Sequence, residues 1–144
     1  MAHHFFLLVL LLLQIGCTNR LAVQTRYLTH ESLASSHVDT PDPNLHRPFI
    51  GQQLIISWYL PDEELAYENL QLNLKVRLRN REEKDITVPI PHVTQGYYIF
   101  KVVNEEFCET GGILTYKVEI LGDSCVLECW KHPLWVELIK FDIK

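Results

Sequence analysis

The residues best suited to chemistry are three cysteines and one histidine in the second half of the chain, Cys108, Cys125, Cys129 and His132. Three thiolates and an imidazole form a donor set that suits tetrahedral Zn²⁺. The alternative is one disulfide and one spare thiol. On an extended strand Cys125 and Cys129 would lie about 13 Å apart, too far to bond, so Cys108 is expected to pair with one of them. We favour this disulfide over the metal, because the sequence lacks a Cys-x2-Cys pair.

A fourth cysteine, Cys17, ends an apolar N-terminal stretch. The run Phe5–Leu13 has about nine residues, which fits the core of an export signal and is short of the ~18–20 residues that span a bilayer. Gly16 and Cys17 resemble the lipobox of bacterial lipoproteins, in which the signal is cut before the cysteine and the thiol carries diacylglycerol. The resemblance implies that Cys17 is lipidated; the alternatives are plain secretion of a soluble protein and an uncleaved anchor.

Composition limits the class of protein. The chain has 144 residues, a formal net charge of -5, 47% hydrophobic residues and 22% charged residues, as expected for one globular domain. The acidic balance argues against a nucleic-acid partner, because phosphate binding needs a basic excess. Gly-x-Ser-x-Gly, His-Glu-x-x-His and Gly-rich phosphate-binding motifs are absent from the sequence. We therefore expect neither an enzyme nor a cofactor.

The chain divides into three parts by composition. Residues 1–16 form the export signal, and residues 17–50 are expected to be the lipidated N-terminus and a flexible tether, because this part is polar and contains Pro41 and Pro43. Residues 51–144 are expected to fold. Oxidation after export supports the disulfide, and if Cys17 is not acylated two disulfides become possible.

The folded part shows hydrophobic residues at every second position, the pattern of half-buried strands. It predicts strands over residues 54–60, 70–78, 86–90, 97–103, 114–120, 125–130 and 134–143. About seven short antiparallel strands indicate an all-β fold, an immunoglobulin or fibronectin type III-like β-sandwich, with a small β-barrel as the alternative.

Several strands carry further signals. Pro89 and Pro91 remove backbone donors, which predicts an edge position for the strand at 86–90. The dense apolar run at 97–103 predicts a strand covered on both faces. The polar stretch 104–112 is expected to be a hairpin loop, and a change of phase near residues 138–139 predicts a β-bulge in the last strand.

Two sets of side chains could form binding surfaces. A basic row lies at period two on the polar side of the strand at 70–78 and continues beyond it: Lys75, Arg77, Arg79 and Arg81. Such a row could meet anionic lipid or an acidic partner, but we favour its neutralisation by the nearby acids Glu83 and Asp85. The second set is the tryptophans. Trp58 is expected in the core, and Trp130 and Trp135 either pack there or stack on sugars.

A broader resemblance rests on residues 112–120, 126–132 and 134–139, which are similar to small uncharacterised lipoproteins of chlamydia-type bacteria. It implies an envelope location and no known activity. We expect a lipid-anchored cell-envelope protein on the periplasmic side of the outer membrane, whose sandwich is a binding or structural module. Its partners would be the membrane, through Cys17, and an envelope protein or a second copy bound covalently by the spare cysteine. The alternatives are a secreted or periplasmic inhibitor or adhesin that uses loop 104–112, and a carbohydrate-binding or hydrolase domain.

Overall fold

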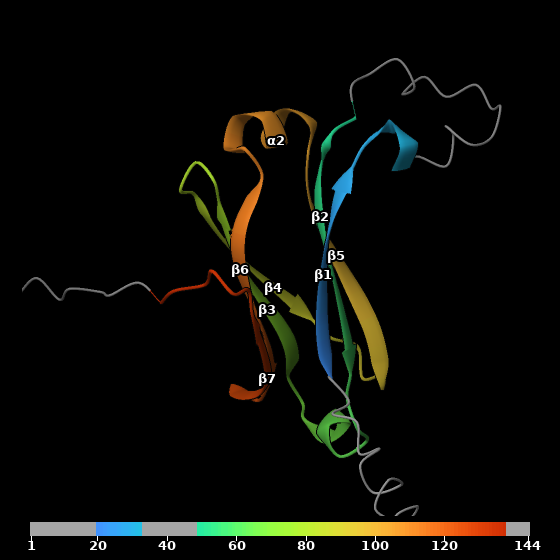
Figure 1. Ribbon diagram of the computed structural model, residues 1–144. Coiled ribbons are helices and arrows are strands. Elements are labelled where there is room, and N and C mark those ends of the chain that lie inside the picture. Colours follow the sequence, from blue (N-terminus) through green and yellow to red (C-terminus); the bar gives the residue numbers. More distant parts are fainter. Residues whose placement is uncertain (1–19, 33–48, 138–144) are drawn as a thin grey trace, which may run out of the picture.

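Two antiparallel sheets pack face to face in the computed structural model, which describes residues 20–32 and 49–137 (Figure 1). The three-stranded sheet has the order β1-β2-β5 and the four-stranded sheet the order β4-β3-β6-β7. The strands are β1 (Leu21–Leu28), β2 (Gly51–Tyr59), β3 (Leu70–Leu78), β4 (Glu83–Pro89), β5 (Gln95–Val103), β6 (Ile113–Gly122) and β7 (Cys125–Lys131). The β-sandwich prediction is confirmed and the barrel alternative is wrong, because the two sheets do not close on each other.

The arrangement is a variant of the immunoglobulin-like sandwich. In the constant-type immunoglobulin order the fourth strand belongs to the sheet of the first, second and fifth strands. Here β4 pairs instead with β3, from Gln71↔Pro89 to Arg77↔Glu83, at the edge of the other sheet. The edge position predicted from the prolines is therefore confirmed.

Strand β1 was not expected. It pairs with β2 over its whole length, from Leu21↔Trp58 to Leu28↔Gly51, so the prediction of a tether is wrong for Leu21–Leu28. Leu21 is buried and Val23 packs against the core, but Thr25 and Tyr27 occupy the same side of the strand and are exposed. The alternation of buried and exposed residues is lost along β1 because the facing sheet covers only part of this edge strand.

The C-terminal part also differs from the prediction. Residues 132–137 follow β7 without forming a strand, so the strand expected at 134–143 is wrong over its described part. Residues 138–144, with the predicted bulge, lie outside the described residues. Within the described residues the number of strands, seven, matches the prediction, but β1 is one of them and the described part of the expected last strand is not.

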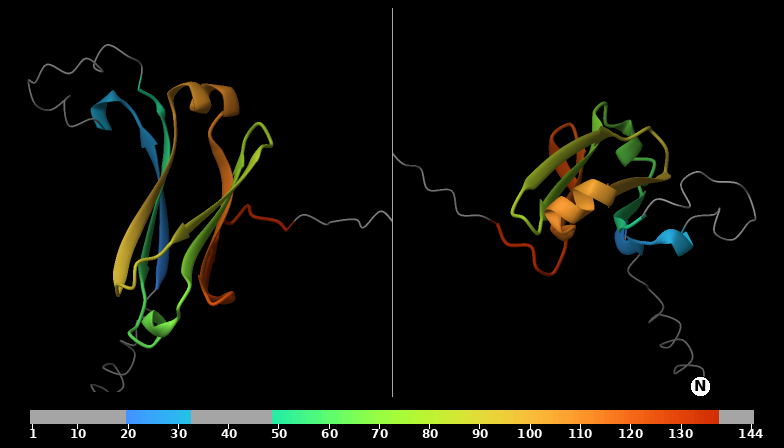
Figure 2. Two further views of the ribbon diagram at one scale, coloured as in Figure 1. Left: turned by 180° about the vertical axis from the view of Figure 1, so that it is seen from behind. Right: turned by 90° about the horizontal axis from the view of Figure 1, so that it is seen from above.

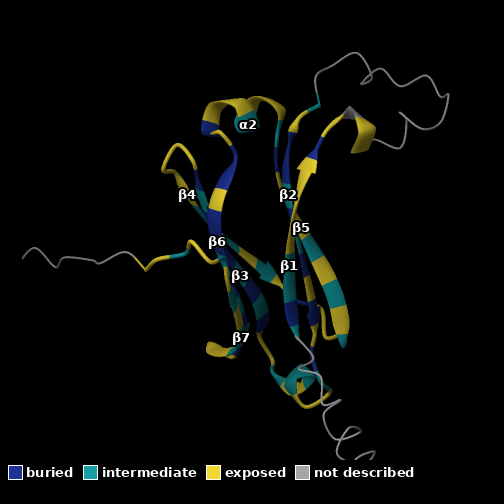
Figure 3. Ribbon diagram, viewed as in Figure 1, coloured by how far each residue is buried: buried dark blue, intermediate teal, exposed yellow. Residues whose placement is uncertain are grey.

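The core lies between the sheets, where the alternating side chains of β2, β3 and β6 meet (Figure 3). Its completely buried members include Leu54, Ile56, Leu72, Leu74, Val118 and Ile120. Strand β3 buries every second residue from Leu70 to Leu78, as its alternation predicts. Removing such a leucine side chain typically costs about 2–5 kcal/mol.

A helix closes one end of the sandwich. The segment expected to be a hairpin loop forms α2 (Asn104–Thr110), which ends at Gly111 in the left-handed conformation (φ 72°). Phe107 packs against the core, Thr110 is buried, and Lys84 of β4 pairs with Glu106 of the helix. The right panel of Figure 2 shows α2 lying across the end of the two sheets. The loop prediction is wrong because one apolar residue, Phe107, secures the segment to the core.

Trp58 is buried, as predicted, and it depends on a glycine in the neighbouring strand. In the β2–β5 register Trp58 is paired with Gly96. A Cβ atom on Gly96 would lie 2.5 Å from Cζ2 of the indole, well inside van der Waals contact. The indole thus occupies the space that any other residue at position 96 would need.

Replacing Gly96 by alanine is expected to destabilise the sandwich by about 1–3 kcal/mol, because the new methyl group must displace the Trp58 ring. Guanidinium unfolding of the two proteins measures the loss. Ser57→Ala is the control: Ser57 precedes Trp58 but is exposed, so its replacement should stay within about 0.5 kcal/mol. Equal unfolding midpoints for wild type and Gly96→Ala would contradict the close approach.

Candidate functional site

The outer face of the three-stranded sheet carries exposed aromatic residues. We call it the tyrosine face and define it as every second residue of 22–26, 53–59 and 95–101. Its most exposed apolar side chains are Tyr97 (71% exposed), Tyr59 (52%) and Ile99 (38%). The register pairs Tyr97 with Ser57 and Ile99 with Ile55, so these side chains lie next to one another. Strand β5 is therefore not covered on both faces, and that prediction is wrong.

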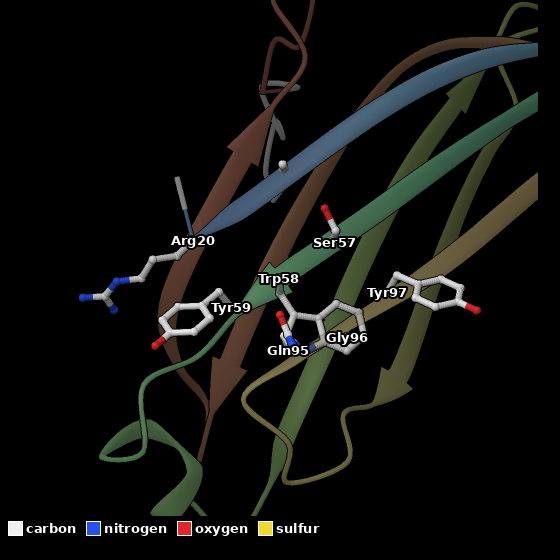
Figure 4. Close-up of a pocket in the computed structure, with 8 residues that line it drawn as sticks. Arg20, Ser57, Trp58, Tyr59, Gln95, Gly96 and Tyr97 are labelled. Atoms are coloured by element: carbon white, nitrogen blue, oxygen red, sulfur yellow. The ribbon is translucent and has the colours of Figure 1, made fainter. Parts of the chain in front are cut away.

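A shallow hollow of about 510 Å³ lies at the β1-start end of the tyrosine face. Figure 4 shows Tyr59 and Tyr97 on neighbouring strands, with Trp58 between them in this view. Ser57 and Gln95 add a hydroxyl and an amide to the lining. These groups bind through stacking, apolar contact and hydrogen bonds.

The charge of the tyrosine face has one sign. Residues 22–26, 53–59 and 95–101 contain no Asp or Glu, although the chain as a whole has a net charge of -5. Arg26 and Lys101 lie on this face, both paired with Gln53 in the strand register, and neither forms an ion pair within the described ranges. Both side chains are exposed. The face therefore combines tyrosines with two uncompensated cations.

Arg20, at the edge of the hollow, is in contrast already engaged. Its Nη1 lies 2.5 Å from Oε1 of Glu64 and 3.5 Å from Oε1 of Glu128. Glu64 belongs to the short helix η4 (Glu64–Ala66), and Glu128 to β7 of the other sheet. Arg20 therefore connects the two sheets at this end and adds little free charge to the face.

The outer face of the four-stranded sheet is organised differently, because residues 132–137 cross it. We call this segment the C-terminal strap. The guanidinium Cζ of Arg77 lies 4.1 Å from the ring centroid of Trp135, and its Nη1 donates to the carbonyl oxygen of Val136 at 2.5 Å. Trp135 is thus neither a core residue nor an open platform for sugars. Trp130, by contrast, packs partly buried against the core.

A carboxylate secures the same strap. Oε1 of Glu137 accepts a hydrogen bond from Trp135 Nε1 at 3.2 Å and lies 3.3 Å from the ammonium groups of Lys117 and Lys131. These hydrogen bonds, from Trp135 first, lower the pKa of Glu137 to about 2. For Lys117, burial alone would lower the pKa, but hydrogen bonds to Glu119 and Glu137 outweigh it and raise the pKa. The strap is therefore held by charge as well as by packing.

Half of the predicted basic row is neutralised, by the two acids that the sequence favoured. Lys75 Nζ lies 3.9 Å from Asp85, and Arg77 Nε donates to Glu83 at 2.6 Å. Arg79 and Arg81 form no ion pair in the part of the chain that the structure describes. Two isolated cations remain in place of a row of four.

The structure does not bring the cysteines together. Cys108, Cys125 and Cys129 are free and exposed, so the predicted disulfide from Cys108 is wrong. Helix α2 carries Cys108 at one end of the sandwich, whereas β7 begins with Cys125 at the other end (Figure 1). Within residues 20–32 and 49–137 no three His, Cys, Asp or Glu residues are grouped to hold a metal, which excludes the Cys108, Cys125, Cys129 and His132 zinc site.

His132 instead has a structural role. Its Nδ1 accepts a hydrogen bond from the backbone N–H of Leu134 at 3.2 Å, and its ring lies 5.1 Å from that of Tyr116. These contacts turn the chain from β7 into the strap. Cys17, the lipidation residue that the sequence predicts, lies outside the described residues, as does the predicted export signal at residues 1–16.

Sequence reasoning did not identify the tyrosine face, although its signal is present. Tyr59 and Tyr97 stand out of phase with the buried residues of their strands, and the three segments that form the face lack acids. Their proximity, however, depends on the pairing of β2 with β5 and β1. That pairing is not a local property of any segment.

Comparison of the chain with protein-family models, curated proteins and solved structures found no match. Among the helices of the described residues, none has the length and apolar character needed to cross a membrane.

The depressed pKa of Glu137 predicts a pH range for release of the strap. Its stabilising charge is fully present above about pH 4.5, the ordinary value, and is lost as the pH falls toward about 2. The NMR signal of the Trp135 indole N–H, which is bonded to Glu137, should therefore shift at the acid end of this range. In Glu137→Gln that shift should disappear. A midpoint near 4.5 in the wild type would contradict the arrangement.

Cys129 should react slowly with alkylating agents at neutral pH. Although Cys129 is an exposed residue, partial desolvation of its thiol, and next the charge of Glu119 in the neighbouring strand, raise the pKa of the thiol, and only the thiolate reacts. Glu119→Gln is expected to lower this pKa and accelerate modification by iodoacetamide severalfold. Mass spectrometry of the Cys129 peptide measures the rate, with Cys125 in the same sample as the reference. An unchanged ratio of the two rates would contradict the prediction.

Proposed function

We propose that this protein is a membrane-anchored cell-envelope lipoprotein whose β-sandwich serves as a binding module, with the tyrosine face as its binding surface. The observation that carries the proposal is the contrast between the two outer faces. The tyrosine face exposes Tyr59 and Tyr97, and the strand segments that form it contain no acid, whereas the opposite face is crossed by the chain's own strap. The open face is the one available to a partner.

Tyrosine suits such a role. Its ring supplies a large contact area with few rotatable bonds to immobilise, and its hydroxyl supplies a hydrogen bond. Ser57 and Gln95 lie in the same hollow and extend the polar contacts. A surface of this composition supports binding rather than chemical transformation of the partner.

The position of β1 supports a short connection to the anchor. Only three residues separate Cys17 from Leu21, where β1 begins, so the two Cα atoms lie at most about 14 Å apart. A diacylglycerol on Cys17 would therefore hold the sandwich directly at the membrane, which we propose to be the periplasmic side of the outer membrane. The long tether expected from the sequence is not needed for this arrangement.

The alternative of an inhibitor or adhesin loses its structural motivation. It required loop 104–112 to insert into a cleft of the partner, but residues 104–110 form α2 and Phe107 packs against the core. The spare-cysteine partner remains possible chemically, since Cys108, Cys125 and Cys129 are all exposed. We place it second, because those thiols share no common surface with the tyrosine face.

Metabolic labelling with a radioactive fatty acid tests the anchor. The wild-type protein should incorporate the label, and Cys17→Ala should not, because the thiol that forms the thioether is missing. Cys125→Ala serves as the matched control, since it removes another exposed cysteine and should leave labelling unchanged. A wild-type protein without label would overturn the lipoprotein assignment.

A further inference from the structure

The tyrosine face has the composition and position of a surface that rests on a membrane. We infer that its partner is an anionic lipid bilayer, on which the sandwich lies flat beside its own anchor. This inference rests on the proposed function, because it names what the binding surface of the anchored module contacts.

The first argument is charge complementarity. Arg26 and Lys101 are exposed and lack ion pairs in the described part of the chain, and no acid shares their face. The three strand segments that form this face contain only cations among their charged residues, although the chain as a whole has a net charge of -5. Anionic headgroups attract such cations by about fivefold in affinity for each one near the surface.

The second argument is the nature of the exposed side chains. Tyr59 and Tyr97 combine an apolar ring with a polar hydroxyl, the combination that is enriched where hydrocarbon meets water. Ile99 and Ile55 form an apolar row beside them. On a sandwich that lies flat, the tyrosines at one end and the isoleucines beside them can enter the interface, while the cations at the other end meet the headgroups.

The third argument is the geometry of the anchor. Cys17 lies four residues before Leu21, so its Cα stays within about 14 Å of the start of β1. Arg26 lies five residues beyond Leu21 along β1, about 17 Å away. A sandwich that lies on its tyrosine face lets the lipid at one end and the cations at the other reach the same bilayer.

An upright orientation is less favourable. The end of the sandwich where β1 begins also holds the β2–β3 and β6–β7 connections (Figure 1). Asp62, Glu63, Glu68 and Asp123 are exposed in these connections. Standing on this end would press four carboxylates against anionic headgroups, whereas lying flat keeps them at the margin.

Vesicle co-sedimentation tests the inference without the lipid anchor. The protein from residue 17 onward, carrying Cys17→Ala, retains every residue of both sheets. It is mixed with phosphatidylcholine vesicles that contain about one third phosphatidylglycerol, and with vesicles of phosphatidylcholine alone. We expect binding to the anionic vesicles that falls steeply as salt is raised toward about 1 M, where charges are screened within about 3 Å.

Two charge reversals on opposite faces provide the matched comparison. Arg26→Glu with Lys101→Glu should weaken vesicle binding at least about 25-fold, at about fivefold for each cation. Arg79→Glu with Arg81→Glu makes the same charge change at exposed cations outside the tyrosine face and should change binding less than about threefold. Tyr59→Ser with Tyr97→Ser should also weaken binding. Circular dichroism verifies that each variant is folded.

The outcomes separate this inference from the proposed function. Three results would overturn the membrane inference. The first is equal binding to both vesicle types, the second is an equal loss of binding from the two charge reversals, and the third is no vesicle binding by the folded wild-type sandwich. Sedimentation equilibrium that shows a dimer broken by Tyr59→Ser with Tyr97→Ser, without vesicle binding, would assign the face to a second copy and also overturn it. Fatty-acid labelling of Cys17 tests the anchor separately, and its result does not depend on vesicle binding by the tyrosine face.

Discussion

The pairing of β1 with β2 is the contact on which the rest of this structure depends. Without it, β2 and β5 would form a two-stranded sheet, which is marginal by itself in water. The register from Leu21↔Trp58 to Leu28↔Gly51 completes a three-stranded sheet and adds Leu21 to the core. It also brings the chain that follows Cys17 to one end of the tyrosine face. One set of backbone hydrogen bonds thereby determines both the stability of this sheet and where the N-terminal part of the chain enters it.

The two outer faces show two ways of managing a solvated sheet surface. On the four-stranded sheet, opposite charges compensate one another and the strap adds Trp135 and Glu137 to them. Exposed pairs of this kind contribute little stability individually, but together they hold the strap in place. On the three-stranded sheet nothing in the described chain covers Tyr59 and Tyr97. Tyr59, Tyr97 and Ile99 are exposed together on this face, where a partner could cover them.

Prediction from the sequence was most accurate where a local pattern reports burial directly. The alternation in β3, the prolines of β4 and the phase of Trp58 each follow from one strand's own residues, and each was confirmed. Hydrophobic alternation gave wrong predictions where the burial of a strand depends on whether another element covers it. Strand β5 looks doubly buried because its outward Tyr97 and Ile99 are apolar, and β1 looks like a tether because the facing sheet covers only its first part. Helix α2 went unrecognised because it is short and polar except for Phe107.

The sequence by itself determined the class of fold, since alternation at period two forces each strand to bury one side, and it predicts a lipidated cysteine through a motif that needs no folding. Only the tertiary structure decided which side chains are neighbours. The fold keeps the three cysteines apart, stacks Arg77 on Trp135 and brings the segments of the tyrosine face together. Each of these results depends on how distant parts of the chain are placed. The physical reason is that strand pairing is a long-range choice: each strand offers the same backbone donors and acceptors, and packing of the whole core selects their partners.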